Sequence, residues 1–131
     1  DFERATPNGI LLRIMQGDEF GKLYRLGELS SNGARRILTI GREDASTFNV
    51  IPIKEATSTY ISRRHCTIEL DDKNSKLFIR DGQWDKEAKD NWVNSLNGTF
   101  INSDEVTMDG AEIHPGDIIS IGDVKLRVEG Y

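Results

Sequence analysis

Hydrophobic residues occur along this chain in short runs, and turn-forming residues separate them about every 8 to 12 positions, as in β-sandwiches and barrels. The runs lie at residues 10–15, 22–26, 36–40, 48–53, 66–70, 76–80, 99–101, 105–107, 117–121 and 124–128. Pairs such as Asp109-Gly110 and Pro115-Gly116 separate them, since glycine admits positive φ and proline fixes φ. No long segment has the 3.6-residue period of a helix. The pattern therefore predicts an all-β protein.

One stretch departs from this pattern. Residues 82–91, GQWDKEAKDN, lack the alternation of a strand and carry many charges. We expect a loop there, with at most one helical turn. A loop of this length is either a surface insertion or a binding element, and the sequence leaves both open.

Composition and charge limit the possible functions. The 131 residues suit one domain, and no apolar run approaches the roughly 20 residues of a membrane-spanning helix. The net charge of −5 argues against a nucleic-acid binder, which must neutralise many phosphates. Cys66 has no second cysteine to pair with, and His65 and His114 cannot form a zinc framework. We expect no metal or cofactor, no membrane or nucleic-acid partner, and an intracellular location, cytoplasmic or nuclear.

Three short strings stand at predicted strand boundaries: Gly41-Arg42, the sequence SRRH at 62–65, and Asn97-Gly98-Thr99. In this order, with the opening hairpin and the closing HPGDIISIGDVKLRV, they resemble the forkhead-associated (FHA) domain. The resemblance implies a two-sheet β-sandwich of about eleven mostly antiparallel strands with ligand loops at one end. It covers residues 9–129, with an insertion at about 82–91, after an N-terminal extension over residues 1–8. The chain starts with Asp1 and has no signal-peptide pattern, which suggests a segment of a longer host protein.

The resemblance also implies a function. FHA domains bind phosphothreonine in a partner protein without catalysing a reaction, and recruit that partner to their host. Phosphothreonine carries about −1.5 to −2 charge and three acceptor oxygens, so its site needs guanidinium and hydroxyl donors. By resemblance Arg42, after Gly41, is the main phosphate ligand, and Ser62 supplies a hydroxyl. Arg63 either joins them at the phosphate or faces solvent.

The remaining site residues have supporting roles. His65 and Cys66 are neighbours on a predicted strand and point to opposite faces, which argues against a nucleophile and base pair and against an enzyme. The resemblance assigns His65 to holding the loop of Ser62, and Asn97 to gripping the peptide backbone. Asn97-Gly98 also reads as a type I′ hairpin turn, with Thr99 stabilising it.

Four residues are candidates for specificity. Tyr60 lies where the family reads residues beyond the phosphothreonine, and Leu96 stands where many relatives have a hydroxyl. Trp84 and Trp92 either anchor a partner or pin the 82–91 loop onto the sandwich. The alternative function is therefore an interaction domain that docks a partner through the sandwich face or the 82–92 loop, independently of phosphorylation.

Overall fold

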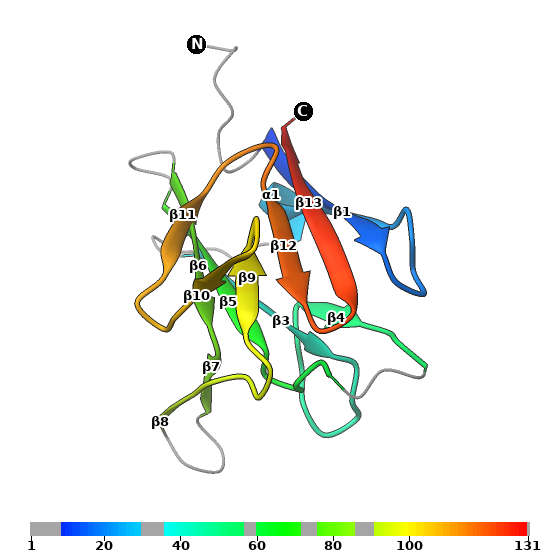
Figure 1. The fold of residues 1–131 in the computed structure, drawn as a ribbon, viewed down its shortest axis with the longest axis vertical. Helices are drawn as coiled ribbons and strands as arrows, with labels where there is room; N and C mark the ends of the chain where they lie inside the picture. Colours follow the sequence, from blue (N-terminus) through cyan, green and yellow to red (C-terminus); the bar gives the residue numbers. More distant parts are fainter. Residues whose placement is uncertain (1–8, 30–35, 57–59, 72–75, 86–90, 131) are drawn as a thin grey trace.

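A computed structural model describes residues 9–29, 36–56, 60–71, 76–85 and 91–130 (Figure 1). The predicted N-terminal extension, residues 1–8, lies outside these ranges. The first half of the described chain contains β1 (Ile10–Gln16), β2 (Leu23–Arg25), α1 (Leu26–Leu29), β3 (Arg36–Arg42), β4 (Ile51–Ile53), β5 (Cys66–Asp71) and β6 (Lys76–Asp81). The second half contains β7 (Gln83–Asp85), β8 (Asn91–Val93), β9 (Thr99–Ile101), β10 (Asp104–Val106), β11 (Ala111–Ile113), β12 (Ile118–Ile121) and β13 (Val124–Gly130).

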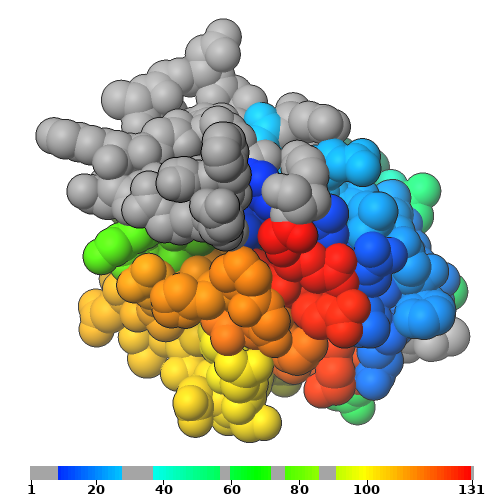
Figure 2. Space-filling model, turned by 90° about the horizontal axis from the view of Figure 1, so that it is seen from above, coloured from blue at the N-terminus to red at the C-terminus, as the bar shows by residue number. Residues whose placement is uncertain are grey.

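Two sheets form the body of the protein. One has six strands in the order β10-β9-β12-β13-β1-β2, and the other has five in the order β11-β6-β5-β3-β4. Seen from above in Figure 2, β13 lies beside β1, as this order requires. The recorded pairings within both sheets are antiparallel except that of β3 with β4. The predicted sandwich of about eleven mostly antiparallel strands is thus confirmed.

Alternation along the strands builds the core. In β1, β3, β5, β12 and β13, aliphatic side chains at every second position are fully buried and pack into one cluster. Members of this cluster include Leu12, Leu38, Ile68, Ile119 and Leu126, each 0% exposed. Each such side chain stabilises the fold by roughly 1.5–3 kcal/mol, which makes the sandwich a rigid support for its loops. Helix α1 has four residues, and no helix in the described part of the chain is long and apolar enough to cross a membrane.

The loop predicted over residues 82–91 is wrong at both of its ends. β7 and β8 pair antiparallel as a separate two-stranded ribbon, with Trp84 opposite Trp92, and residues 86–90 lie outside the described chain. In β7 the alternation is present but inverted, because Gln83 and Asp85 are buried while Trp84 is 52% exposed. A search for buried hydrophobic residues therefore misses this strand. The sequence pattern also fails to predict β11, whose three residues include one buried hydrophobic side chain, Ile113.

Loops gather at the end of the sandwich opposite the start of β1 and the end of β13, which is the lower end of Figure 1. Three chain segments meet there: the end of β3, the segment at residues 60–65 that enters β5, and the segment at residues 94–98 between β8 and β9. They carry the three strings that the sequence singles out.

Candidate functional site

Backbone hydrogen bonds join the first two of these segments. The Arg42 N–H donates to the Ser62 carbonyl at 3.0 Å, and the His65 N–H donates to the Ile40 carbonyl at 3.2 Å. The segment that enters β5 therefore continues alongside the end of β3. Residues 20 positions apart in the sequence, Arg42 and Ser62, thus come to lie side by side.

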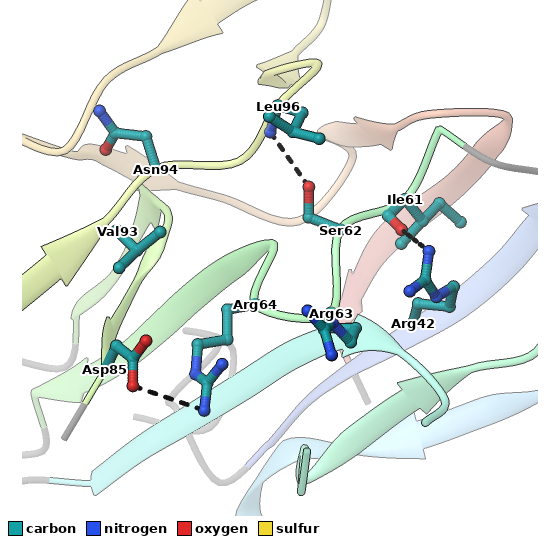
Figure 3. A pocket seen from close by; sticks show the side chains of 9 residues that line it. All are labelled: Arg42, Ile61, Ser62, Arg63, Arg64, Asp85, Val93, Asn94 and Leu96. Atoms are coloured by element: carbon teal, nitrogen blue, oxygen red, sulfur yellow. Dashed lines mark hydrogen bonds and ion pairs between the residues drawn. The ribbon is translucent and has the colours of Figure 1, made fainter. Parts of the chain in front are cut away.

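An open cleft of about 320 Å³ lies over this junction (Figure 3). Its lining comprises Arg42, Ile61, Ser62, Arg63, Arg64, Asp85, Val93, Asn94 and Leu96. Three guanidinium groups and one carboxylate make the lining cationic, although the whole chain carries a net charge of −5. Ile61, Val93 and Leu96 add apolar surface. The arrangement suits a ligand that carries a compact anion on a partly apolar chain.

The three arginines have different partners. Arg42 donates from Nη1 to the Ile61 carbonyl at 3.4 Å, and its side chain is 37% exposed. Arg63 is exposed and donates from Nη1 to Ser46 Oγ at 3.3 Å. Arg64 pairs through Nη2 with Asp85 Oδ1 of β7 at 3.6 Å. The ribbon thus supplies the cleft with a buried carboxylate that offsets the charge of Arg64.

The Ser62 hydroxyl is oriented by its neighbours. Its Oγ accepts a hydrogen bond from the Leu96 N–H at 3.0 Å, while the Ser62 N–H donates to His65 Nδ1 at 3.0 Å. A hydroxyl has one hydrogen and two lone pairs, so accepting from Leu96 leaves its hydrogen available for an acceptor in the cleft. Ser62 is therefore set to act as a donor.

His65 links two loops. Because Nδ1 accepts from the Ser62 N–H, the ring is neutral with its hydrogen on Nε2, which donates to the Gly98 carbonyl at 2.8 Å. Burial lowers the pKa of His65, although the Gly98 carbonyl and the Asp81 charge partly oppose this shift. Both ring nitrogens are engaged, so His65 holds the loops of Ser62 and Gly98 together.

A buried carboxylate that the sequence analysis missed organises the segment at residues 94–98. Asp81 Oδ1 accepts from Ser95 Oγ at 2.6 Å and from Thr99 Oγ1 at 2.7 Å, and Oδ2 accepts from the Ser95 N–H at 3.1 Å. Ser95 Oγ accepts in turn from the Gly98 N–H at 2.8 Å. Asp81 thereby fixes the turn that presents Leu96 to Ser62. The alternation of β6 indicates that Asp81 is buried, because Asp81 follows Leu77 and Ile79 on the buried face of the strand.

Gly41 is required by a close approach of two chain segments. A Cβ at this position would lie 2.1 Å from the Arg63 carbonyl oxygen and 2.8 Å from Asn49 Nδ2. Asn49 is buried and donates from Nδ2 to that same carbonyl at 2.7 Å. Only glycine lets β3 lie so close to the segment that carries Ser62 and Arg63.

The turn type predicted for Asn97-Gly98 is wrong. A type I′ turn needs positive φ at both residues, but only Gly98 has it, at 90°. The pair of positive φ angles occurs at Asn102 (49°) and Ser103 (82°), which connect β9 to β10. Instead of closing a hairpin, Asn97 is exposed and donates from Nδ2 to the Tyr60 carbonyl at 3.0 Å. Its side-chain oxygen has no recorded partner among the described residues.

The specificity candidates differ in exposure. Leu96 is 89% and Tyr60 54% exposed, and both lie beside Asn97. Trp92 is half-buried and donates from Nε1 to the Asp81 carbonyl at 2.9 Å, which pins the ribbon to the sandwich. Trp84 on the paired strand is half-exposed.

Cys66 lies in the core, 0% exposed, where burial raises the pKa of its thiol far above the ordinary range. It is therefore a protonated core side chain. Within the described ranges, no group of three or more His, Cys, Asp or Glu side chains is placed to hold a metal ion.

The fold and the cleft define a β-sandwich with a cationic cleft built from loops at one end. The sequence model of the FHA domain family matches residues 38–122, so the chain belongs to the FHA domain family. No curated protein sequence shows a significant match to the chain.

Three solved structures illustrate the likeness. The crystal structure of the FhaA FHA domain complexed with the intracellular domain of Rv3910 is 24% identical, with a TM-score of 0.62 and coverage of 92% of this chain and 99% of that one. A structure from an analysis of phosphothreonine-dependent FHA domain interactions is 24% identical, with a TM-score of 0.63 and coverage of 93% and 96%. The FHA domain of an Arabidopsis thaliana hypothetical protein is 23% identical, with a TM-score of 0.66 and coverage of 97% and 90%. At these identities the likeness shows the shared fold.

Proposed function

We propose that residues 9–129, with the 82–91 insertion, form a non-catalytic module that binds a phosphothreonine segment of a partner protein and recruits it to the protein that carries the module. The observation that supports this most is the juxtaposition of Arg42 and Ser62, joined by a backbone hydrogen bond of 3.0 Å at the floor of a cationic cleft. Membership of the FHA family and a structural neighbour studied for phosphothreonine-dependent interactions give further support.

The proposed contacts use Arg42, Ser62 and Arg63 of the cleft lining, together with Asn97, which follows Leu96 of that lining. The guanidinium groups of Arg42 and Arg63 donate to phosphate oxygens, and Ser62 donates its free hydroxyl hydrogen to another. Asn97 already donates to Tyr60, so its side-chain oxygen accepts from a backbone N–H of the peptide. His65, Gly41, Gly98 and Thr99 position these groups without touching the ligand.

A peptide mixture with one fixed phosphothreonine and random flanking residues tests the proposal. We expect the protein to bind it, and not the unphosphorylated mixture, in a fluorescence anisotropy titration. Arg42→Ala should weaken binding by about 100-fold or more, because it removes charge-assisted hydrogen bonds to a dianion. Arg127→Ala is a matched control, since its side chain on β13 has a similar exposure of 43%. Equal affinity for both mixtures would reject the proposal.

A second candidate function rests on Trp84. This side chain is 52% exposed on the ribbon, which supplies a large apolar surface beside the cleft. If the ribbon docks a partner independently of phosphorylation, Trp84→Ala should abolish capture of that partner from a cell lysate, while Arg42→Ala and phosphatase treatment should leave it intact. The reverse pattern would support phosphothreonine recognition.

A further inference from the structure

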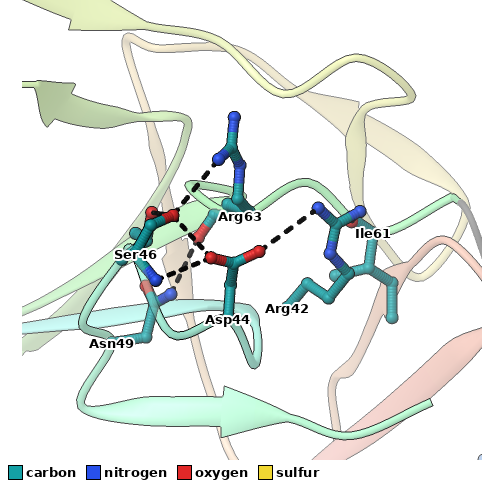
Figure 4. Close-up of polar contacts among 7 residues, drawn as sticks. Arg42, Asp44, Ser46, Asn49, Ile61 and Arg63 are labelled. Atoms are coloured by element: carbon teal, nitrogen blue, oxygen red, sulfur yellow. Dashed lines mark hydrogen bonds and ion pairs between the residues drawn. The ribbon is translucent and has the colours of Figure 1, made fainter. Parts of the chain in front are cut away.

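A tight turn just after β3 places a carboxylate against the arginines of the cleft (Figure 4). Asp44 Oδ1 accepts from the Ser46 N–H at 2.8 Å and from Ser46 Oγ at 2.5 Å, and the Thr47 N–H donates to the Asp44 carbonyl at 3.2 Å. Asp44 is thereby held in one orientation by its own loop. Its other oxygen, Oδ2, lies 3.9 Å from Arg42 Nη2.

The same turn reaches the second arginine of the proposed site. Arg63 Nη1 donates to Ser46 Oγ at 3.3 Å, and Ser46 Oγ bonds to Asp44. Hydrogen bonds from Ser46 and the charges of Arg63 and Arg42 lower the pKa of Asp44, so it is ionised at neutral pH. The negative charge of Asp44 therefore lies beside Arg42 directly and is linked to Arg63 through Ser46.

We propose that Asp44 is an internal counter-ion that competes with the ligand for Arg42 and Arg63, and that it thereby restricts the cleft to dianionic ligands. This inference rests on the proposed function of the cleft. A ligand carboxylate that displaced Asp44 from the arginines would replace one single negative charge with another, so its binding would gain little free energy. A phosphate, with a charge of about −1.5 to −2 and three acceptor oxygens, gains both charge and hydrogen bonds. Asp44 is thus a specificity-determining residue that rejects peptides with Asp or Glu at the position of the phosphothreonine.

Asp44→Asn tests this directly. The asparagine side-chain oxygen still accepts from the Ser46 N–H, so the turn is preserved while the charge is lost. Glu43→Gln is the matched control, because it removes one negative charge at the neighbouring position. The Glu43 side chain pairs with Lys54 at 3.7 Å and not with Arg42. The probes are three peptide mixtures with phosphothreonine, threonine or glutamate at the fixed position, together with inorganic phosphate followed by the NMR shifts of the Arg42 and Ser62 amides.

The expected result is a gain of affinity in one variant only. Removing a unit charge this close to two guanidinium groups should tighten binding of the phosphothreonine mixture and of inorganic phosphate by roughly tenfold. We expect the wild type to bind the glutamate mixture no better than the threonine mixture. The Asp44→Asn variant should bind the glutamate mixture measurably. Glu43→Gln should behave as the wild type. Thermal unfolding of each variant confirms that the compared proteins are folded.

Unchanged or weaker binding of inorganic phosphate and of the phosphothreonine mixture by folded Asp44→Asn would overturn the inference, and would mean that Asp44 orients the arginines for the ligand. An equal gain in Glu43→Gln would also overturn it, because net charge alone would then explain the effect. The proposed function fails separately. If the wild type binds the phosphorylated and unphosphorylated mixtures equally, but Asp44→Asn still tightens inorganic phosphate roughly tenfold, Asp44 is a counter-ion in a cleft that does not read phosphothreonine.

Discussion

Asp81→Ala should strongly destabilise the protein, because Asp81 accepts three hydrogen bonds that hold the turn at residues 94–98. The donors are Ser95 N–H, Ser95 Oγ and Thr99 Oγ1, at 2.6–3.1 Å, and the carboxylate is only 7% exposed. A buried donor left without an acceptor costs about 1–3 kcal/mol. The free energy gained by no longer burying a carboxylate offsets part of this sum. We therefore expect a loss of about 2–4 kcal/mol in the free energy of unfolding, against a typical total of about 5–15 kcal/mol.

Urea denaturation at pH 7 measures the effect, and two further variants sharpen it. Asp81→Asn keeps one oxygen acceptor, so its loss should lie between zero and that of Asp81→Ala. Asp104→Ala is the control, since this aspartate is exposed on the edge strand β10 and should change stability by less than about 0.5 kcal/mol. In Asp81→Ala the NMR signals of the Ser62 and Leu96 amides should also shift, because the turn no longer presents Leu96 N–H to Ser62 Oγ.

Two results would refute this reasoning. A loss in Asp81→Ala below about 1 kcal/mol would mean that water or a rearranged loop satisfies the three donors equally well. A large loss without any change at Ser62 and Leu96 would mean that Asp81 stabilises the sandwich but does not organise the cleft.

Three further perturbations test other contacts of the site. Ser62→Ala should weaken phosphothreonine binding by roughly tenfold or more in the anisotropy titration. Its free energy of unfolding should change by less than about 1 kcal/mol, because the Leu96 N–H is exposed and water replaces Oγ as its acceptor. Unchanged affinity would mean that Ser62 does not contact the ligand. Gly41→Ala should abolish binding and destabilise the fold by about 1–3 kcal/mol or more, because its Cβ would lie 2.1 Å from the Arg63 carbonyl oxygen; wild-type binding and stability would contradict that close approach. Burial lowers the pKa of His65, so the unfolded chain takes up the proton more readily than the folded protein. The contribution of His65 to stability should be complete above the ordinary histidine pKa of about 6.5 and be lost as the pH falls through the folded-state pKa. An NMR titration in which the ring of His65 titrated at or above the ordinary value would contradict this prediction.

Much of the fold could be predicted from the sequence because it depends on alternation and turn residues, which are local signals. The runs at residues 10–15, 66–70 and 76–80 became β1, β5 and β6 with boundaries that differ by no more than one residue. The ribbon could not be predicted, because β7 buries Gln83 and Asp85 and exposes Trp84. Gln83 Nε2 lies within 2.8–3.2 Å of the Ile40 and Cys66 carbonyls and of Asn49 Oδ1, so its two hydrogens are shared among three acceptors from other segments. A strand whose buried side chains are polar and are satisfied by backbone and side-chain groups of distant segments has no hydrophobic signature.

The candidate site divides in the same way. Arg42, Ser62 and Asn97 could be proposed because their strings stand at strand boundaries in the order that resembles the FHA domain. Asp44 could not, because an aspartate just after a strand reads equally well as a solvated turn residue. The alternation of β6 places Asp81 on the buried face but does not identify its hydrogen-bond partners. The fold brings Ser95 and Thr99 to Asp81 from β9 and the segment before it, whereas Asp44 is bonded by Ser46 of its own turn.

The contrast between an acidic chain and a cationic cleft also limits what the cleft can bind. Charges farther apart than about 8 Å are largely screened at physiological ionic strength, so a ligand in the cleft interacts mainly with Arg42, Arg63, Arg64 and the carboxylates beside them. The chain as a whole carries a net charge of −5, so a polyanion that extends beyond the cleft gains little from its additional phosphates. A single phosphate on a peptide avoids this repulsion. The net charge of the chain and the local arginines are therefore both consistent with the isolated dianion proposed as the ligand.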